Sequence, residues 1–337
     1  MPTNTKALQV AEPVTNITGK NAIINGGMDI WQRNTSFTAA GFVADRWYLN
    51  SDGGIATTTV RSTDAPTGFR YSIKIQRNSG NTGTGAHGIG QAFETSESIR
   101  FAGKTVTYSF YAKKGANYSA ASNLLEWRVG FSTGTDQSIT TAYGGWTSYS
   151  EANYPPATLT TSWQRFSMTF TVPAGTTQIS IRVFQAPVGT AGADDSYYVT
   201  GFQFEEGSVA TPFSRAGGTQ QGELAVCQRY FCKSYNTETA PATNTGVGQV
   251  GWTVVSNTTN SNNFYSKFPV TMRGTPVVTL YSPSNSQSGT ICNNSLGSNK
   301  ACSAIDIGSN GFVFYVTDAA GTVGYYLGGH YKADAEL

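Results

Sequence analysis

Thr-Val-Thr-Tyr-Ser-Phe-Tyr, residues 105–111, is the stretch that decides the fold class of this chain. Polar and apolar side chains alternate along it, and in a β-strand successive side chains point to opposite faces of the sheet. The stretch therefore predicts a strand with one face in a core. Residues 71–76, Tyr-Ser-Ile-Lys-Ile-Gln, and residues 166–172, Phe-Ser-Met-Thr-Phe-Thr-Val, alternate in the same way.

Short alternating runs continue along the chain, separated by clusters of Gly, Asn, Ser and Pro. They lie at 178–184, 197–204, 251–256, 263–270, 276–281, 303–307, 311–317 and 322–327. Short strands separated by such turn signals are typical of β-sandwiches and barrels. We therefore predict an all-β chain, in which the most apolar runs, 276–281 and 311–317, are central strands.

Residues 219–233 break this pattern. Leu224, Cys227, Tyr230 and Phe231 follow one another at helical spacing, just after the Gly217-Gly218 pair. At roughly 100–200 residues per domain, the 337 residues favour two domains. We predict an extended N-terminal arm (1–20), a jelly-roll-like β-sandwich domain (21–215), a linker with a short helix (216–234) and a C-terminal β-sandwich domain (235–337).

The composition excludes two classes of partner. Charged residues make up 12% of the chain, against about 25% in an average soluble domain. The net charge is +2, and no run of Lys or Arg could neutralise several phosphates at once, so we expect no nucleic-acid partner. No 18 apolar residues run together and the polar start lacks a signal-peptide core, so we expect neither membrane insertion nor export through a signal peptide.

The four cysteines do not form a known metal pattern. Cys227 and Cys232, and Cys292 and Cys302, have spacings that match no common zinc motif, and four cysteines are too few for a disulfide scaffold. Free buried thiols are one interpretation. A disulfide between Cys292 and Cys302 is the other.

Residues with catalytic chemistry are scarce, and we expect neither an enzyme nor a cofactor. The chain has two histidines, His87 and His330. Gly83-Thr-Gly-Ala-His-Gly88 formally matches a dinucleotide-binding loop, but the sequence after it, Ile89 to Phe93, indicates a strand. A phosphate would then lack the helix N-terminus that binds it.

Adjacent carboxylates occur at two places, 194–195 and 205–206. Neighbours in a strand point to opposite faces, so neither pair can share a substrate, and solvated charges are the favoured interpretation. Calcium binds clustered oxygen ligands. Asp194, Asp195 and Glu205 are therefore candidates for a structural calcium site.

Two aromatic groups are candidate contacts with a glycan or another subunit. The first lies in the loop 142–156 and comprises Tyr143, Trp146, Tyr149 and Tyr154. Aromatic faces stack on sugar rings, but Tyr and Trp are also enriched at subunit interfaces, and such a loop can fold onto its own core. The second group comprises Tyr325, Tyr326 and Tyr331, and one of the adjacent Tyr325 and Tyr326 should point outward.

Several segments resemble phage tail-fibre and related virion proteins. The similar segments are Asn21-Ala-Ile-Ile-Asn-Gly-Gly-Met-Asp-Ile-Trp-Gln-Arg33, Ala44-Asp-Arg-Trp-Tyr48, Gly201-Phe-Gln-Phe-Glu-Glu-Gly-Ser-Val-Ala-Thr-Pro-Phe213, Glu223-Leu-Ala-Val-Cys-Gln-Arg-Tyr230, Phe268-Pro-Val-Thr-Met-Arg-Gly-Thr-Pro276 and Ala333-Asp-Ala-Glu-Leu337. Trp163-Gln-Arg-Phe166, followed by Thr169-Phe-Thr-Val-Pro173, resembles a carbohydrate-binding-module jelly roll. The matches are spread over most of the chain.

The resemblance implies a virion structural protein, and specifically a tail-fibre subunit. It implies a first domain like a carbohydrate-binding jelly roll, a helical connector and a C-terminal β-domain that often forms the distal tip. We expect attachment to other virion proteins through the N-terminal arm, a homotrimer, and recognition of a host-surface glycan. Two alternatives stay open: a structural head-decoration, cement or head-fibre protein, and a glycan-degrading tailspike. The motifs carry no catalytic residues.

Overall fold

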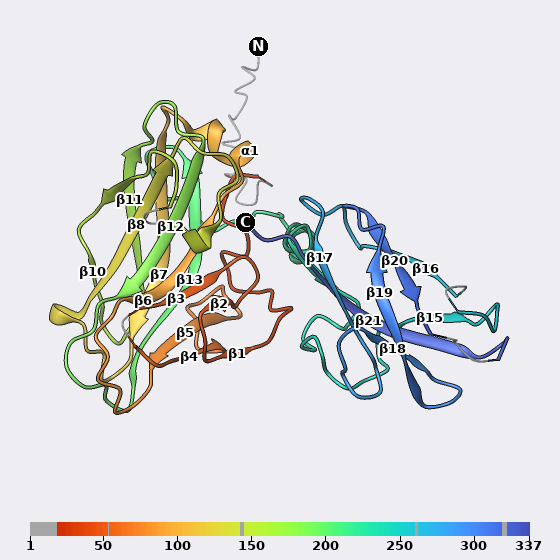
Figure 1. Cartoon of the computed structure of the whole chain (residues 1–337). Coiled ribbons are helices and arrows are strands. Elements are labelled where there is room, and N and C mark those ends of the chain that lie inside the picture. Colours follow the sequence, from red (N-terminus) through yellow and green to blue (C-terminus); the bar gives the residue numbers. More distant parts are fainter. Residues whose placement is uncertain (1–18, 53, 142–144, 260–261, 319–321) are drawn as a thin grey trace, which may run out of the picture.

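The computed structural model describes residues 19–337 apart from 53, 142–144, 260–261 and 319–321, so nearly all of the predicted arm lies outside the described residues. Two β-units lie side by side, with the C-terminal end of the chain between them (Figure 1). We call strands β1–β13 the N-terminal unit and strands β14–β21 the C-terminal unit. The predicted domain boundaries stay predictions.

The described residues of the N-terminal unit form two antiparallel sheets, one of six strands and one of seven. The six-stranded sheet contains, in spatial order, β1 (Ser36–Phe37), β4 (Thr57–Ser62), β5 (Ser72–Arg77), β13 (Asp195–Glu206), β7 (Thr105–Lys114) and β11 (Gln164–Thr171). The seven-stranded sheet contains β10 (Ala157–Thr158), β8 (Leu124–Ser132), β12 (Gln178–Gln185), β6 (His87–Ala92), β3 (Tyr48–Ser51) and β2 (Gly41–Phe42), with β9 (Ser150–Asn153) paired to β8.

The core of this unit lies between the two sheets. Tyr108 and Phe110 of β7 point inward because strand side chains alternate, and both rings contact Trp127 of the facing sheet, with centroids 5.7 and 5.1 Å apart. Phe202 stacks on Phe110 at 5.3 Å. Each such ring buries on the order of 150–250 Å². The alternation of side chains at 105–111 therefore identifies Tyr108 and Phe110 as residues of the sandwich core.

The C-terminal unit is organised around β21 (Tyr326–Asp334), its longest described strand. β21 pairs with four strands: β14 (Phe231–Lys233), β15 (Val250–Thr253), β17 (Val277–Tyr281) and β18 (Thr290–Asn293). Beyond β18 follow β19 (Ser298–Ile305), β20 (Gly311–Val316) and β16 (Phe264–Lys267). Phe312 and Phe314 lie in its core, with ring centroids 4.8 Å apart.

The prediction that 276–281 is a central strand is wrong, although 311–317 lies between two strands as expected. Among the described strands β17 pairs only with β21, and its Val277 side chain is 73% exposed. The central strand β21 instead carries two adjacent glycines, Gly328 and Gly329. A Cβ at Gly329 would lie 2.7 Å from Ile291 Cγ2, so close packing leaves no room for a side chain at that position.

The predicted helix is shorter than its apolar pattern. α2 spans Gln220–Gln228, and the hydroxyl of Thr219 caps it by accepting from Gly222 N at 3.0 Å. Tyr230 and Phe231 lie beyond it, because the chain turns at Arg229 and Phe231 enters β14. Both rings are buried by tertiary contacts. The two residues therefore extend the apolar spacing of a helix in the sequence, although they lie outside the helix. The remaining described helices are short: α1 (Thr95–Ser98), η1 (Ile99–Phe101), η2 (Ala121–Asn123) and η3 (Ile139–Thr141).

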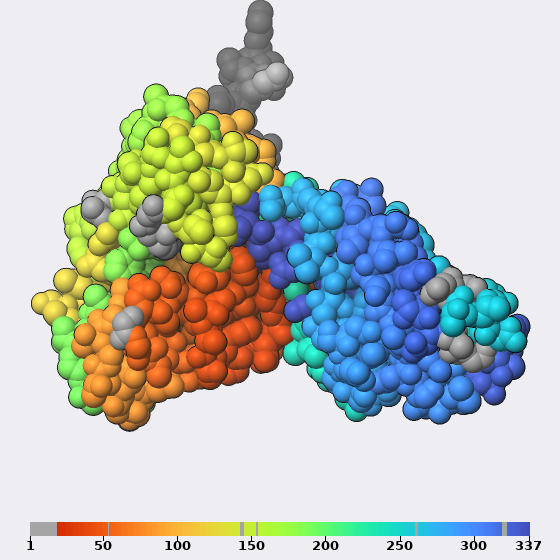
Figure 2. Space-filling model, in the orientation of Figure 1, coloured from red at the N-terminus to blue at the C-terminus, as the bar shows by residue number. Residues whose placement is uncertain are grey.

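The two units meet at a junction with an apolar and a polar part. The apolar part is a buried cluster of Ala92, Ile139, Trp146, Tyr230 and Leu337, which we call the junction cluster. The polar part includes bonds in both directions between the chain segments at 32 and 231–233. Gln32 Nε2 donates to the carbonyl of Phe231 at 2.8 Å, and Lys233 Nζ donates to the carbonyl of Gln32. Residues at the C-terminal end fill the space between the units (Figure 2).

The structure confirms the predicted fold class, all-β with sandwich-like units and a short helical connector. All four cysteines are free and buried, which agrees with the first of the two interpretations and not with a disulfide between Cys292 and Cys302. Burial raises the pKa of the Cys232 thiol to about 12. Within the described residues, no helix is long and apolar enough to cross a membrane.

Candidate binding groove

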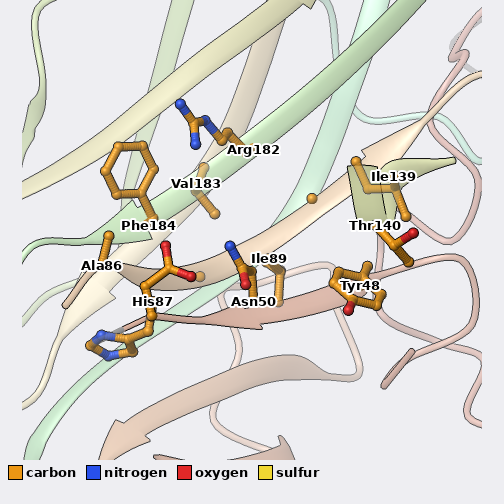
Figure 3. Close-up of a pocket in the computed structure, with 13 residues that line it drawn as sticks. Tyr48, Asn50, Ala86, His87, Ile89, Ile139, Thr140, Arg182, Val183 and Phe184 are labelled. Carbon is orange, nitrogen blue, oxygen red and sulfur yellow. The ribbon is translucent and has the colours of Figure 1, made fainter. Parts of the chain in front are cut away.

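A groove of about 100 Å³ lies on the outer face of the seven-stranded sheet. It lies over β3, β6 and β12, with η3 at one end (Figure 3). The groove is lined by Tyr48, Asn50, Asp52, Ala86, His87, Gly88, Ile89, Gly90, Ile139, Thr140, Arg182, Val183 and Phe184.

Two glycines of β6 make the floor of the groove. Gly88 pairs with Asn50 on one side and Phe184 on the other, and Gly90 pairs with Tyr48 and Arg182. Because glycine has no side chain, the floor between the side chains of β3 and β12 is formed by the β6 backbone. Gly88 is also required by packing, since a Cβ there would lie 2.1 Å from the carbonyl oxygen of Val183.

The groove combines aromatic rings with polar groups. Tyr48 and Phe184 supply the rings, and Asn50 and Asp52 supply an amide and a carboxylate on the β3 side. Within the described part of the chain, neither the Asn50 amide nor the Asp52 carboxylate has a hydrogen-bond partner or an ion pair, so both are available to a ligand. Thr140 adds a hydroxyl at the end of the groove, bonded to the Ser138 hydroxyl at 2.8 Å.

A carboxylate fixes the rim on the β12 side. Glu151 bonds Arg182 at 2.6 Å and Arg128 at 2.7 Å through its two oxygens, and accepts from the Tyr149 hydroxyl at 3.0 Å. The guanidinium carbons of Arg128 and Arg182 lie 5.2 and 4.8 Å from the centroid of the Phe184 ring. Ion pairs and cation–π contacts therefore hold this ring and both arginines in one arrangement.

The aromatic residues predicted in the loop 142–156 are not gathered on an open surface. Tyr143 lies outside the described residues. Trp146 is buried in the junction cluster and donates from Nε1 to the carbonyl of Ser138 at 2.8 Å. Tyr154 packs against the N-terminal core, and burial raises its pKa to about 12. Tyr149 donates from its hydroxyl to Glu151, the carboxylate that holds Arg182 at the groove.

The predicted C-terminal aromatics also separate. Tyr331 is buried in the C-terminal core, where its ring contacts Phe312 at 5.2 Å, and Tyr325 packs against the same core. Tyr326 is 42% exposed and is the outward member of the adjacent pair. These three residues form no common surface with the groove residues, because they belong to the other unit.

The three calcium candidates have protein partners. Asp195 is buried and pairs with Arg77 at 3.2 Å. Asp194 points away from it, accepting from Ala116 N at 3.0 Å, and Glu205 accepts from Thr211 N at 2.9 Å. Among the described residues, no three His, Cys, Asp or Glu side chains come together in a group that could hold a metal ion. The geometry gives the calcium prediction no support.

Both histidine side chains are buried, although His87 is among the residues that line the groove. The His87 side chain points away from the groove residues (Figure 3), and burial lowers its pKa to about 4. His330 stacks on Tyr235 at 3.8 Å and bonds the Ser234 hydroxyl through Nδ1 at 2.8 Å. Both imidazole rings are therefore packed inside the protein.

Five groove side chains were not predicted as site residues from the sequence: Tyr48, Asn50, Asp52, Arg182 and Phe184. One feature of the sequence indicated where the groove lies. Gly88 and Gly90 alternate within a run that otherwise indicates a strand. Glycines inside a strand often mark a position where another group approaches the backbone closely.

Comparison with known proteins gives remote structural likenesses. No family model and no curated protein matches the sequence. The bacteriophage CBA120 tailspike protein 4 enzymatically active domain is 13% identical over 56% of this chain, with a TM-score of 0.37, and the match spans about a fifth (21%) of that chain. A CBM4 structure is 20% identical (TM-score 0.33; 54% of this chain, 98% of that chain). The C-terminal family 22 carbohydrate-binding module of Clostridium thermocellum Xyn10B is 13% identical (TM-score 0.34; 52% and 94%). These TM-scores are too low for a shared function to be inferred.

Proposed function

We propose that this chain is a virion structural protein, a phage tail-fibre subunit, that binds a host-surface glycan in the groove of the N-terminal unit. The observation that carries the glycan part is the chemistry of the groove. Ring faces suit the apolar faces of a sugar, and the amide of Asn50 and the carboxylate of Asp52 suit its hydroxyls. Both polar groups lack partners within the described residues, and a hydroxylated ligand would satisfy them.

The virion part of the proposal is supported by the segments that resemble tail-fibre proteins. In this proposal the N-terminal region, 1–20, attaches the subunit to other virion proteins, and the subunit is a homotrimer. Sedimentation of purified protein tests the oligomer. A monomer at high protein concentration would contradict it.

A glycan array made from host-surface polysaccharides tests binding, with Asn50→Ala and Phe184→Ala as the groove variants. Asn236→Ala is the matched control, because Asn236 is exposed and lies outside the groove. We expect Asn50→Ala to raise Kd up to about ten-fold, because one hydrogen bond contributes about 0.5–1.5 kcal/mol. Asn236→Ala should bind as the natural protein does.

Three other results would redirect the proposal. Equal Kd values for all three variants would place glycan binding outside the groove. Failure of the natural protein to bind any host glycan or host cells would leave the structural decoration or cement role. Shortened polysaccharide chains after incubation would favour the glycan-degrading tailspike.

A further inference from the structure

The end wall of the groove is held by the C-terminal unit. Ile139 and Thr140 of η3 line the groove, and Ile139 is buried in the junction cluster beside Leu337. The hydroxyl of Ser138, directly before η3, donates to the main-chain oxygen of Leu337 at 2.8 Å. Leu337 thus shares a buried apolar cluster with Ile139 of η3 and accepts a hydrogen bond from the residue directly before η3.

A side wall depends on the same region. Tyr48, which lines the groove from β3, packs against the junction cluster. Two residues earlier, Arg46 has a backbone φ of 73°, a conformation that non-glycine residues adopt at an energetic cost. Its guanidinium pairs with Glu336 in a buried site, and its carbon lies 3.6 Å from the centroid of the Tyr230 ring. These contacts hold the backbone that leads into β3.

The residues that make these contacts are themselves fixed to the C-terminal unit. Glu336 and Leu337 follow β21, the strand on which that unit is built. Ala335 N donates to the carbonyl of Tyr230 at 2.8 Å, and Arg273 Nε donates to the carbonyl of Ala335 at 3.0 Å. A displacement of β21 would therefore move the groove walls.

We propose that Leu337 and Glu336 are positioning residues for the groove, so that ligand affinity in the N-terminal unit depends on the docked C-terminal unit. This inference rests on the proposed function, since it concerns the same site. Linkage makes the effect reciprocal: a ligand that binds the ordered groove stabilises the junction by the same factor. The C-terminal unit then has a role in recognition without contacting the glycan.

The first experiment compares Leu337→Ala with Val316→Ala in the full chain. Val316 is buried in the C-terminal core and contributes nothing to the junction cluster. At a temperature where both variants are folded, we expect Leu337→Ala to raise the glycan Kd about five-fold, the low end of typical coupling. Val316→Ala should leave Kd unchanged, and Leu337→Met should restore affinity. A Kd for Leu337→Ala equal to that of the natural protein overturns the proposal.

The second experiment needs no glycan. Amide hydrogen exchange at residues 138–141 should be faster in Leu337→Ala than in Val316→Ala, because only the first variant removes a contact to η3. Equal exchange in the two variants overturns the positioning role. If the natural protein binds no glycan, the proposed function fails, but this measurement still decides whether the C-terminal unit orders the groove wall.

The third experiment compares amide hydrogen exchange of the natural protein with and without saturating glycan. A contact with a purely structural role would give the same exchange in both. Reciprocal coupling predicts slower exchange at the amides of residues 335–337 in the natural protein when glycan is bound. These residues lie outside the groove. Unchanged exchange there, with glycan bound, would contradict the coupling.

Discussion

Glu151 at the groove and Glu336 at the junction occupy the same kind of site in two parts of the molecule. Each carboxylate bonds two arginines, and each arginine pair lies against aromatic rings. At the groove the arginines are Arg128 and Arg182, and both face Phe184. The side chains there keep contact with solvent: Glu151 is 14% exposed and Arg128 is 29% exposed.

At the junction the same arrangement is buried more deeply from solvent. Glu336 bonds Arg33 at 3.1 Å through one oxygen and pairs with Arg46 through the other. Arg33 lies 3.8 Å from the centroid of Phe231, and Arg46 lies against Tyr230. The side chains of Glu336 and Arg46 are only 4% and 2% exposed. The same three charges are therefore more strongly desolvated here than at the groove.

The difference teaches that burial, rather than the list of partners, sets what such a cluster does. Exposed ion pairs contribute about 0–1 kcal/mol, because water screens them. Removing one partner of a buried pair costs about 3–5 kcal/mol, because a buried charge is left uncompensated. We therefore infer that Glu336 joins the two units, whereas Glu151 arranges a binding surface with little effect on stability.

The largest effect should come from Glu336→Gln. The change keeps the shape of the side chain and removes the charge between two buried arginines, so the free energy of unfolding should fall by about 3 kcal/mol. Urea unfolding measures it. Glu206→Gln is the control, because Glu206 forms an exposed pair with Lys104 at 3.5 Å and its loss should change stability by less than about 0.5 kcal/mol. Equal losses for both variants would remove the distinction between buried and exposed pairs.

The second-largest effect should be a pH dependence of the free energy of unfolding that arises from Asp45 at the junction. Burial raises the pKa of Asp45 from 3.8 to about 6, although Arg33, 3.8 Å away, lowers it. Because the folded pKa lies above the unfolded one, the stabilising contribution is complete below the unfolded pKa and is lost as the pH rises through the folded pKa. Acidification from about pH 7 to about pH 5 should therefore stabilise the natural protein by about 1 kcal/mol relative to Asp45→Asn.

Urea unfolding of both proteins at the two pH values measures this difference. Only the difference between them reports Asp45, since other groups titrate in the same range. His87 is one such group: burial lowers its pKa to about 4, so its contribution to stability falls on acidification. Parallel pH profiles for the natural protein and Asp45→Asn would show that Asp45 is not desolvated in solution.

Of the three predicted effects on stability, the smallest should come from Glu151→Gln, at less than about 1 kcal/mol. Arg128 and Arg182 can be hydrated when their carboxylate partner is removed, since they are 29% and 21% exposed. Glycan affinity should nevertheless fall, because the arrangement of Arg182 and Phe184 at the rim loosens. A calorimetric titration with the glycan identified on the array measures affinity. A loss of stability as large as that of Glu336→Gln would abolish the contrast between the two clusters.

Some of the candidate site was within reach of sequence reasoning, and most was not. Gly88 and Gly90 are two alternate positions of a predicted strand that carry no side chain. The walls could not be found, because Asn50 and Phe184 are 134 residues apart in the chain and meet only through strand register with Gly88. The sequence left open whether the loop aromatics are exposed or packed, and Trp146 is buried only because the junction covers it.

The sequence by itself determined the all-β class, the sandwich core and the short connector. It did so because side-chain alternation records burial residue by residue, as at 105–111, and needs no knowledge of neighbouring strands. Only the tertiary structure decided which strands are central, which aromatics are exposed and where a groove opens. Those properties depend on the order and register of strands that are distant in the chain, and on contacts between two units, and no local pattern encodes either.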